Sequence, residues 1–293
     1  MTKTTIPVYD ICTIDHRAQK DLLVEAFAPY LQKHYGHLHR PHRHSFYHLV
    51  LFISGQGKHS IDFEQFNVEP FQIYFMIPGQ VHSWHFDGGV DGYIVHFSES
   101  LFSSFLQDAH YLERFRFFSG VASDGVCQLS GEAQNVAADL FRSMLAEVGS
   151  VPVQNMDLIR IKLLELFILV DRNCAKMEAR TIPLHKHTLL RSFQQLVDKH
   201  YRDIRLPKEY ADLLYVTPNH LNALCQDLLG KSAGDLIRNR TLLEAKRLLT
   251  NAEMTITEVA YDLNFKENSY FNRFFKKAEG VTPDDFRKNF INQ

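Results

Sequence analysis

Two different periodicities divide the chain into a strand-rich first part and a helical second part. Between residues 47 and 98, short apolar runs are separated by turn residues, as in "SGQG" and "DGGVDG". Short runs at this spacing are typical of strands in a β-sandwich or barrel. The predicted strands are "YHLVLFIS" (47–54), "GKHSIDF" (57–63), "FQIYFMI" (71–77), "HSWHF" (82–86) and "GYIVHFS" (92–98).

From residue 99 onward, apolar residues recur at steps of three and four, which is typical of amphipathic helices. Two long helices are predicted over 130–148 and 153–173. The second is apolar over a wider arc than one neighbour would cover. We expect it to be partly core and partly a dimer face, with plain core as the alternative. Polar residues and Pro183 then interrupt the pattern, which predicts a linker at 177–186.

Charge is distributed unequally between these parts of an otherwise ordinary globular composition. The 293 residues are 45% hydrophobic and 23% charged, which does not indicate disorder. Residues 1–176 carry 14 Lys+Arg and 19 Asp+Glu, a net charge of −5, whereas residues 177–293 carry 18 and 15, a net charge of +3. A basic part attached to an acidic part is one charge distribution found in nucleic-acid-binding proteins with a separate control domain.

Cysteine usage and the lack of a long apolar run indicate where the protein works. Cys12, Cys127, Cys174 and Cys225 occur singly, so they suggest neither a disulfide framework nor a zinc module, and a reducing cytoplasm fits. The longest apolar run, 163–170, is far shorter than the roughly 20 residues of a membrane span, and the amino terminus lacks the apolar core of a signal peptide. We expect a soluble, cytoplasmic protein with no membrane partner.

An internal repeat indicates the functional unit of the second part. Residues 211–237 align with 260–286 at an offset of 49 and, after one extra residue in the turn, of 50. Each copy has a short helix, a tight turn, a second helix and a Gly stop, which describes a helix-turn-helix unit. The matched pairs are Ala211/Ala260, Leu214/Leu263, Val216/Phe265, Leu221/Phe271, Asn222/Asn272, Leu224/Phe274, Gly230/Gly280, Ser232/Thr282 and Asp235/Asp285.

The second helix of each unit offers the chemistry needed to read DNA. Amides and hydroxyls suit base edges, and cations suit phosphates and guanine. One amphipathic helix with a polar face is more often a solvated surface, but two in tandem favour DNA. In the second copy, Tyr270, Phe271, Phe274 and Phe275 are expected to face the core. The candidate DNA contacts are Thr217, Asn219, His220, Asn222, Lys266, Asn268, Ser269, Asn272, Arg273, Lys276 and Lys277.

The segment "ITEVAYDLNFKENSYFNRFFKKAEGVTPDDFR" (256–287) resembles the carboxyl-terminal signature of AraC-family transcription regulators. The resemblance spans 187–290 and implies two helix-turn-helix units that are joined by a long helix, here 232–250, and that both enter the DNA major groove. The sequence departs from the family at two positions. Asn264 replaces the usual Gly, and we expect the turn to survive because Asn tolerates a left-handed backbone. Thr241 replaces a frequent Arg, which we expect to weaken the DNA contacts of the linker helix more than the fold.

The strand-rich part resembles the cupin-like effector domain that precedes this module in many family members. It carries H-x-H-x-x-x-H at 42–48 and P-G-x-x-H at 78–82. By strand parity, His42, His44 and His48 point to one side of a sheet. Imidazoles suit zinc, iron or manganese, but metal-binding cupins have Glu where this chain has His48, and the regulators that it resembles typically dispense with the metal.

We therefore expect a small-molecule pocket in the barrel, with no metal and no cofactor. The pocket candidates are His44, Phe46, His48, His82, Trp84 and Phe86. If a metal were held, its candidate ligands would be His42, His44, His48 and His82. The chain has 16 histidines, so some of the others are expected to be incidental, namely among His34, His37, His39, His59, His85 and His96.

The sequence is interpreted as an α+β two-domain transcription regulator. Residues 1–176 are expected to form a cupin-like β-barrel with trailing helices for effector binding and dimerisation. Residues 177–186 are the predicted linker, and 187–293 the all-α, AraC-type DNA-binding domain. The expected partners are double-stranded DNA, a small-molecule effector and a second copy in a homodimer, and contact with RNA polymerase is compatible with the resemblance.

Two other interpretations of the barrel stay open. It could be a metal-dependent enzyme, such as a dioxygenase, or a metal sensor, tethered to the DNA-binding domain. It could instead bind no small ligand and serve only dimerisation or a protein partner. We expect no enzyme, because no nucleophile with its base, phosphate loop or paired carboxylate stands out in the sequence.

Overall fold

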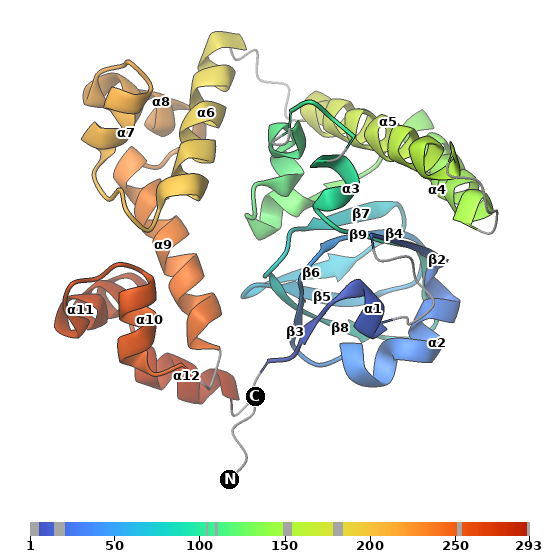
Figure 1. The fold of residues 1–293 in the computed structure, drawn as a ribbon, viewed down its shortest axis with the longest axis horizontal. Coiled ribbons are helices and arrows are strands. Elements are labelled where there is room, and N and C mark those ends of the chain that lie inside the picture. Colours follow the sequence, from blue (N-terminus) through green and yellow to red (C-terminus); the bar gives the residue numbers. More distant parts are fainter. Residues whose placement is uncertain are drawn as a thin grey trace. The chain divides into compact units, whose positions relative to one another are not determined.

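The computed structural model describes residues 6–14, 21–103, 105–108, 111–148, 154–177, 184–250 and 254–291. Contacts divide the chain into two compact units, residues 7–179 and residues 180–293 together with 1–6 (Figure 1). The first contains two β-sheets and helices, and the described part of the second is built from helices. The α+β fold class predicted from the sequence is therefore confirmed.

Two five-stranded sheets form the framework of the first unit. The strands are Val8–Tyr9 (β1), Leu22–Ala26 (β2), His42–His44 (β3), Tyr47–Ser54 (β4), Gly57–Ile61 (β5), Glu64–Val68 (β6), Gln72–Met76 (β7), Val81–Phe86 (β8), Asp91–Phe97 (β9) and Val126–Gln128 (β10). The first sheet has the order β1-β3-β8-β5-β6, and the second has the order β10-β7-β4-β9-β2. Their inner faces share one hydrophobic core, to which Val50, Phe52 and Trp84 belong.

The second sheet is covered on both faces, which explains the continuous apolar run of β4. Its inner side chains, such as Val50 and Phe52, belong to the core between the sheets. Its outer side chains, such as Leu49 and Leu51, belong to a separate core beneath helices. Strands buried on both faces have apolar residues at consecutive positions rather than at alternate ones.

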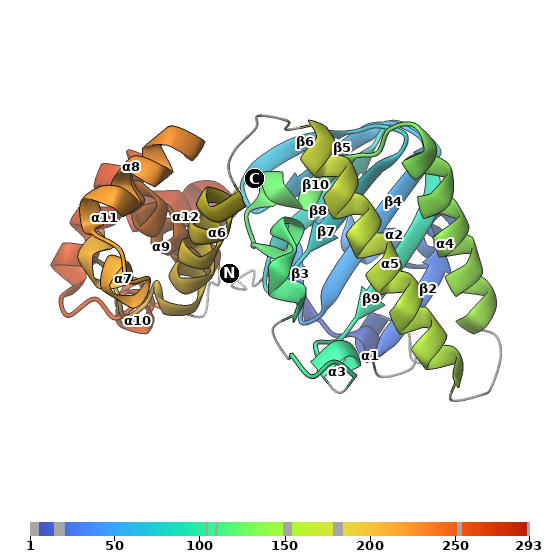
Figure 2. The same cartoon turned by 90° about the horizontal axis from the view of Figure 1, so that it is seen from above.

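The described helices of the first unit are Ile11–Ile14 (α1), Phe27–Leu38 (α2), Ser100–Ser103 (α3), Glu132–Val148 (α4) and Gln154–Met177 (α5), with 3-10 turns at Tyr111–Arg114, Arg116–Phe118 and Ala122–Gly125. Helices α3, α4 and α5 belong to the outer core of the second sheet, over which α4 and α5 lie in Figure 2, whereas α1 and α2 contribute to the core between the sheets. The sequence predicted α4 and α5 but missed α2, β2, β6 and β10. Phe141 of α4 and Phe167 of α5 are fully buried in the outer core.

The second unit has two small cores that share one long helix. Its helices are Leu184–His200 (α6), Pro207–Leu213 (α7), Pro218–Leu229 (α8), Ala233–Leu249 (α9), Ile256–Asp262 (α10), Asn268–Glu279 (α11) and Pro283–Ile291 (α12). The beginning of α9 packs with α6, α7 and α8, and its end packs with α10, α11 and α12. Pro207, Pro218 and Pro283 each occupy a first helical position, where a missing N–H does no harm.

The segment predicted as a linker, 177–186, overlaps helix at both ends. Helix α5 continues to Met177 and α6 begins at Leu184, while 178–183 lie outside the described residues. None of the described helices has the length and apolarity that crossing a bilayer requires.

The pairing of two cysteines corrects the sequence analysis. Cys127 on β10 and Cys174 on α5 form a disulfide, with Cα atoms 6.5 Å apart, whereas Cys12 and Cys225 are free thiols. The two partners are 47 residues apart in the sequence. Their pairing depends on how α5 packs beside β10, which cysteine spacing does not reveal.

Candidate nucleic-acid interface and ligand site

The two helix-turn-helix units are built with the same turn. In the first, α7 and α8 are connected by a turn in which the Val216 N–H donates to the Ala211 carbonyl at 3.0 Å. In the second, between α10 and α11, the Phe265 N–H donates to the Ala260 carbonyl at 2.9 Å. Asn264 has a left-handed φ of 56°. The expectation that this turn survives without Gly is therefore confirmed.

The ends of the two second helices also match. Gly230 and Gly280 end α8 and α11 with left-handed φ angles of 65° and 86°. Two residues after each Gly, Ser232 caps α9 by accepting from the Asp235 N–H at 3.1 Å, and Thr282 accepts from the Asp285 N–H at 3.2 Å. Each Asp carboxylate in turn accepts a hydrogen bond from the hydroxyl of its Ser or Thr. The structural repeat therefore extends over the whole alignment found in the sequence.

Helix α11 presents a basic face opposite its buried aromatic residues. Phe271 and Phe275 are fully buried, whereas Ser269, Arg273, Lys276 and Lys277 are exposed. Among the described residues, Arg273, Lys276 and Lys277 have no ion-pair partner. Phe274 is half-buried. Tyr270 is 59% exposed, which corrects the prediction that it faces the core.

Two of the predicted base-reading amides are already engaged within the domain. The Asn222 Oδ1 accepts from the Ala233 N–H at 3.2 Å, which holds α8 to the start of α9. The equivalent of Ala233 in the second copy is Pro283, which has no N–H. The Asn272 amide instead donates to the Asn268 carbonyl at 2.8 Å and to the Asn268 Oδ1 at 2.9 Å. These amides stabilise helix ends in the free protein.

The remaining candidates lie at the surface of the two units. Thr217 caps α8, because its Oγ1 accepts from the His220 N–H at 3.1 Å, and Asn219 and His220 are exposed in the first turn. Lys266 is exposed in the turn between α10 and α11 of the second unit. Asn268 begins α11 and donates from Nδ2 to the Thr257 Oγ1 at 3.0 Å.

Thr241 does not lie on an exposed face of α9. It is fully buried, and its hydroxyl lies 3.1 Å from the Ile237 carbonyl and 3.4 Å from the Tyr201 carbonyl. Helix α9 therefore folds with Thr at this position, and the expected loss of DNA contacts from the linker helix stays a prediction. The Thr241 side chain packs α9 against the end of α6.

The predicted barrel pocket is a set of side chains packed together between the two sheets. His44, His48, His82, Phe46 and Trp84 are all at least 98% buried, and Phe86 is half-buried. His42 and His44 lie on β3 and His48 lies on β4, in the opposite sheet, so the expectation that all three point to one side of a single sheet is wrong. All three side chains nevertheless point into the space between the sheets. The His44 and His48 rings stack at 5.1 Å with planes only 7° apart.

Two of the histidines that the sequence did not assign to the pocket belong to the same interior cluster. His59 on β5 and His96 on β9 are fully buried. The His59 Nε2 lies 3.1 Å from the His82 Nδ1, and the His96 ring lies 4.9 Å from that of His48. The alternation of side chains along each strand could have predicted that these two point inward. Only the packing of the two sheets shows that six histidines meet: His42, His44, His48, His59, His82 and His96.

Burial keeps these imidazoles neutral. Loss of hydration lowers the pKa of His42 to about 4 and that of His48 to about 3. The same cause, with repulsion from neighbouring histidines as a smaller one, holds the pKa of the other four well below the usual value of 6.5. Each neutral ring has one N–H donor and one nitrogen lone pair.

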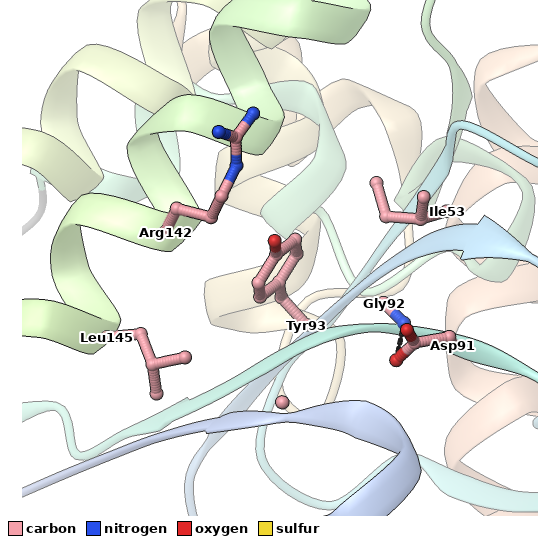
Figure 3. Close-up of a pocket in the computed structure, with 7 residues that line it drawn as sticks. Ile53, Asp91, Gly92, Tyr93, Arg142 and Leu145 are labelled. Atoms are coloured by element: carbon pink, nitrogen blue, oxygen red, sulfur yellow. Dashed lines mark hydrogen bonds between the residues drawn. The ribbon is translucent and has the colours of Figure 1, made fainter.

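A cavity of about 250 Å³ lies elsewhere, on the outer face of the second sheet (Figure 3). Arg142 and Leu145 of α4 line one side, and Asp91, Gly92 and Tyr93 of β9 line the other, with Ala26 and Ile53 completing it. None of the six side chains predicted to form the effector pocket lines this cavity.

Comparison with known proteins identifies both units. A family model described as a helix-turn-helix domain matches residues 210–289, and one described as an AraC-like ligand binding domain matches residues 26–159. The chain belongs to the AraC family of transcription regulators. As an AraC-family member, it combines a helix-turn-helix DNA-binding domain with a ligand-binding domain, as the sequence predicts.

Several named proteins are similar to this AraC-family chain over most of its length. The arabinose operon regulatory protein of Escherichia coli is 27% identical over 82% of this chain and 80% of its own. The HTH-type transcriptional activator RhaR of Yersinia pseudotuberculosis is 22% identical over 85% of each chain. The structure of Vibrio cholerae ToxT bound to an unsaturated fatty acid is 14% identical, with a TM-score of 0.43, over 92% of this chain and 95% of that one.

These relatives bear on the alternatives left open by the sequence. The two named relatives are transcription regulators and not enzymes. They lend no support to a metal-dependent enzyme or metal sensor as the function of this AraC-family chain.

Proposed function

We propose that α8 and α11 are the two recognition helices with which this regulator reads one stretch of double-stranded DNA. The observation that carries this proposal is their equivalence: each follows the same turn and ends at a left-handed Gly. Asn219 and His220 on α8, and Ser269 and Arg273 on α11, are the exposed side chains able to reach base edges. Lys266, Lys276 and Lys277 suit phosphates.

We further propose that a small molecule bound by the first unit controls this binding. The match to an AraC-like ligand binding domain supports the proposal. The cluster of inward imidazole and aromatic side chains around His44, His82 and Trp84 supplies polar groups within apolar walls, as ligand sites do. In this proposal the first unit binds the effector without catalysing a reaction on it. The protein acts in the cytoplasm, where its DNA lies.

Helix α5 is the proposed dimer face. Its inner side, which includes Leu163 and Phe167, is fully buried in the outer core. Its other side exposes Leu158 by 43%, Ile161 by 52% and Ile168 by 37%. Apolar side chains at this helical spacing form a stripe that a second copy would cover. A homodimer would present two pairs of recognition helices to DNA. RNA polymerase is a further candidate partner of the DNA-bound protein.

The experiment that tests the proposal begins with the genomic sites that the protein occupies in cells. The full chain and the fragment 184–293 are then compared on one such site and on a scrambled duplex, at several salt concentrations. We expect the fragment to keep its preference for the genomic site and a strong salt dependence, because both recognition helices and both small cores belong to it. Equal binding of the fragment to both duplexes, with a preference shown only by the full chain, would refute the assignment of specificity to this unit.

A further inference from the structure

Three histidines of the first sheet converge on one point between the sheets. His42 and His44 lie on β3, and His82 lies on β8 directly opposite His42. One nitrogen from each ring can be chosen so that all three atoms lie within 4.8 Å of one another. The three side chains are 0%, 2% and 1% exposed. Nitrogens this close together could bind one metal ion after small rotations of the side chains.

Hydrogen bonds to two of these rings already direct a lone pair inward. The His42 Nδ1 lies 2.7 Å from the Arg40 carbonyl, so this nitrogen carries the proton and Nε2 keeps its lone pair. The His82 Nδ1 lies 3.1 Å from the His59 Nε2, and donation from His82 to His59 leaves the His82 Nε2 with a lone pair. In the metal-free protein this Nε2 lies 2.7 Å from the His44 Nε2 and accepts its proton, so a metal ion would replace the hydrogen bond between these two rings. Metal-binding histidines are typically oriented by such a second hydrogen bond.

The cluster contains more buried nitrogens than its hydrogen bonds use. The His42 Nε2, the His44 Nδ1, the His59 Nδ1 and both nitrogens of His48 and His96 are buried without a hydrogen-bond partner among the described residues. A buried polar group without a hydrogen-bond partner destabilises a fold. So many unmatched imidazole nitrogens in one place indicate a site that binds something polar rather than an ordinary packed core.

We propose that His42, His44 and His82 bind one divalent transition-metal ion of the Zn²⁺ class inside the first unit. Uncharged imidazole nitrogens are the donors that Zn²⁺, Co²⁺ and Ni²⁺ favour, and the cluster offers none of the oxygen ligands that Mg²⁺ and Ca²⁺ require. His48 of the facing sheet supplies the fourth side of the site, since its ring lies 5.1 Å from those of both His44 and His82. His59 is a positioning residue that orients His82.

The consequence is a link between the two sheets, because His42, His44 and His82 belong to one sheet and His48 to the other. This inference goes beyond the proposed function and does not depend on it. Metal binding is measured without DNA, so a negative result for metal binding does not refute the proposed reading of DNA, and a negative result for DNA binding does not refute the metal site.

The test uses the full chain after treatment with a chelator, titrated with Co²⁺ and then with Zn²⁺. We expect one Co²⁺ per chain, with the visible absorption of a low-coordinate nitrogen site, and its displacement by one Zn²⁺. Zn²⁺ should also raise the unfolding temperature of the wild-type chain. His44→Gln and His82→Gln should each weaken binding at least 100-fold, and His59→Gln should weaken it about 10- to 100-fold.

His85→Gln is the matched control, because His85 lies on the same strand as His82 but is exposed on its opposite face. It should leave Co²⁺ binding unchanged. Circular dichroism of the metal-free variants shows whether each one folds. The Co²⁺ absorption spectrum of the wild-type chain tests the proposal without any variant. The proposal is overturned if the wild-type chain takes up no stoichiometric Co²⁺ or Zn²⁺. It is also overturned if folded His44→Gln and His82→Gln chains bind as tightly as His85→Gln, which would place the ion on surface histidines.

Discussion

Tyr215 and Asn264 occupy the same position in the turns of the two repeats, and both adopt a left-handed backbone, with φ angles of 55° and 56°. The conformation is common for Asn and costs a bulky residue such as Tyr about 1–2 kcal/mol. The Tyr215 side chain is 97% exposed, so it offers no packing in return. The first repeat therefore has a strained turn that the second repeat avoids.

Tyr215→Asn is expected to stabilise the second unit by about 0.5–1 kcal/mol, because Asn relieves most of this strain. The reverse change, Asn264→Tyr, should destabilise it by a similar amount. Urea unfolding of both variants measures the two effects, with Tyr215→Phe as a control that keeps the ring and the strain. A loss of stability in Tyr215→Asn would show that the exposed ring makes a contribution that its surroundings do not reveal.

The tandem repeat could be predicted from the sequence because its signals are local. Apolar spacing, the Gly stops and the Ser/Asp and Thr/Asp caps each act within a few residues, and the structure keeps them where the alignment placed them. The hydrogen bonds of Asn272 were harder to predict. Its counterpart Asn222 accepts from the Ala233 N–H, but the residue equivalent to Ala233 in the second repeat is Pro283, which has no N–H. Asn272 therefore donates to Asn268 within its own helix.

The interior of the first unit was harder to predict because it is made of contacts that are distant in sequence. Strand parity gave the inward direction of His44 and His82 correctly. It gave no information about which strands face each other, so the sequence did not show that His59 and His96 lie beside the other four histidines of the cluster. The same limit applied to the disulfide, which depends on how one helix packs beside a strand that the sequence analysis missed.

Glu244 holds the linker helix α9 through two arginines. Its carboxylate lies 3.1 Å from the Arg240 Nη1 and 3.4 Å from the Arg247 Nη1, and the Arg240 Nε lies 2.8 Å from Asp198 on α6. Burial alone would raise the pKa of Glu244, but Arg247 and Arg240 outweigh it and the pKa lies below its usual value. Glu244→Gln should destabilise the second unit by about 1–3 kcal/mol near neutral pH.

The pH dependence of this loss has a definite sign. A carboxyl whose pKa is lowered by folding stabilises the fold above its unfolded pKa, and this contribution disappears as the pH falls through the folded pKa. The difference between wild-type and Glu244→Gln chains should therefore shrink as the pH is lowered below about 4. Asp284→Asn, in an exposed pair with Lys288, is the control and should change little. A difference that stays constant down to pH 2 would contradict the assignment to the charged form.

The exposed apolar stripe of α5 predicts a dimer that a single charge would disrupt. Wild-type protein should sediment as a dimer at tens of micromolar, which corresponds to an association free energy of roughly −6 to −7 kcal/mol or stronger. Ile161→Glu should sediment as a monomer, because a carboxylate in the centre of the stripe would be buried without a partner. Val121→Glu, which changes an exposed apolar residue outside α5, should remain dimeric. A wild-type monomer at this concentration would rule out α5 as a dimer face.

The division of work on α11 provides the most direct test of DNA reading by this unit. Arg273 projects from the middle of the helix, opposite the buried Phe271 and Phe275, whereas Lys277 lies one turn further on. Arg273→Ala should lose roughly 1–3 kcal/mol on the genomic site and relax the preference at one base pair, as expected for a bidentate contact with guanine. Lys277→Ala should weaken binding to all sequences alike and reduce the salt dependence by about one phosphate.

Both variants are measured on the genomic site and on a scrambled duplex at several salt concentrations. We expect a loss confined to the genomic site for Arg273→Ala and a uniform loss for Lys277→Ala. Equal, sequence-independent losses for the two variants would contradict it, because Arg273 would then contact only the DNA backbone.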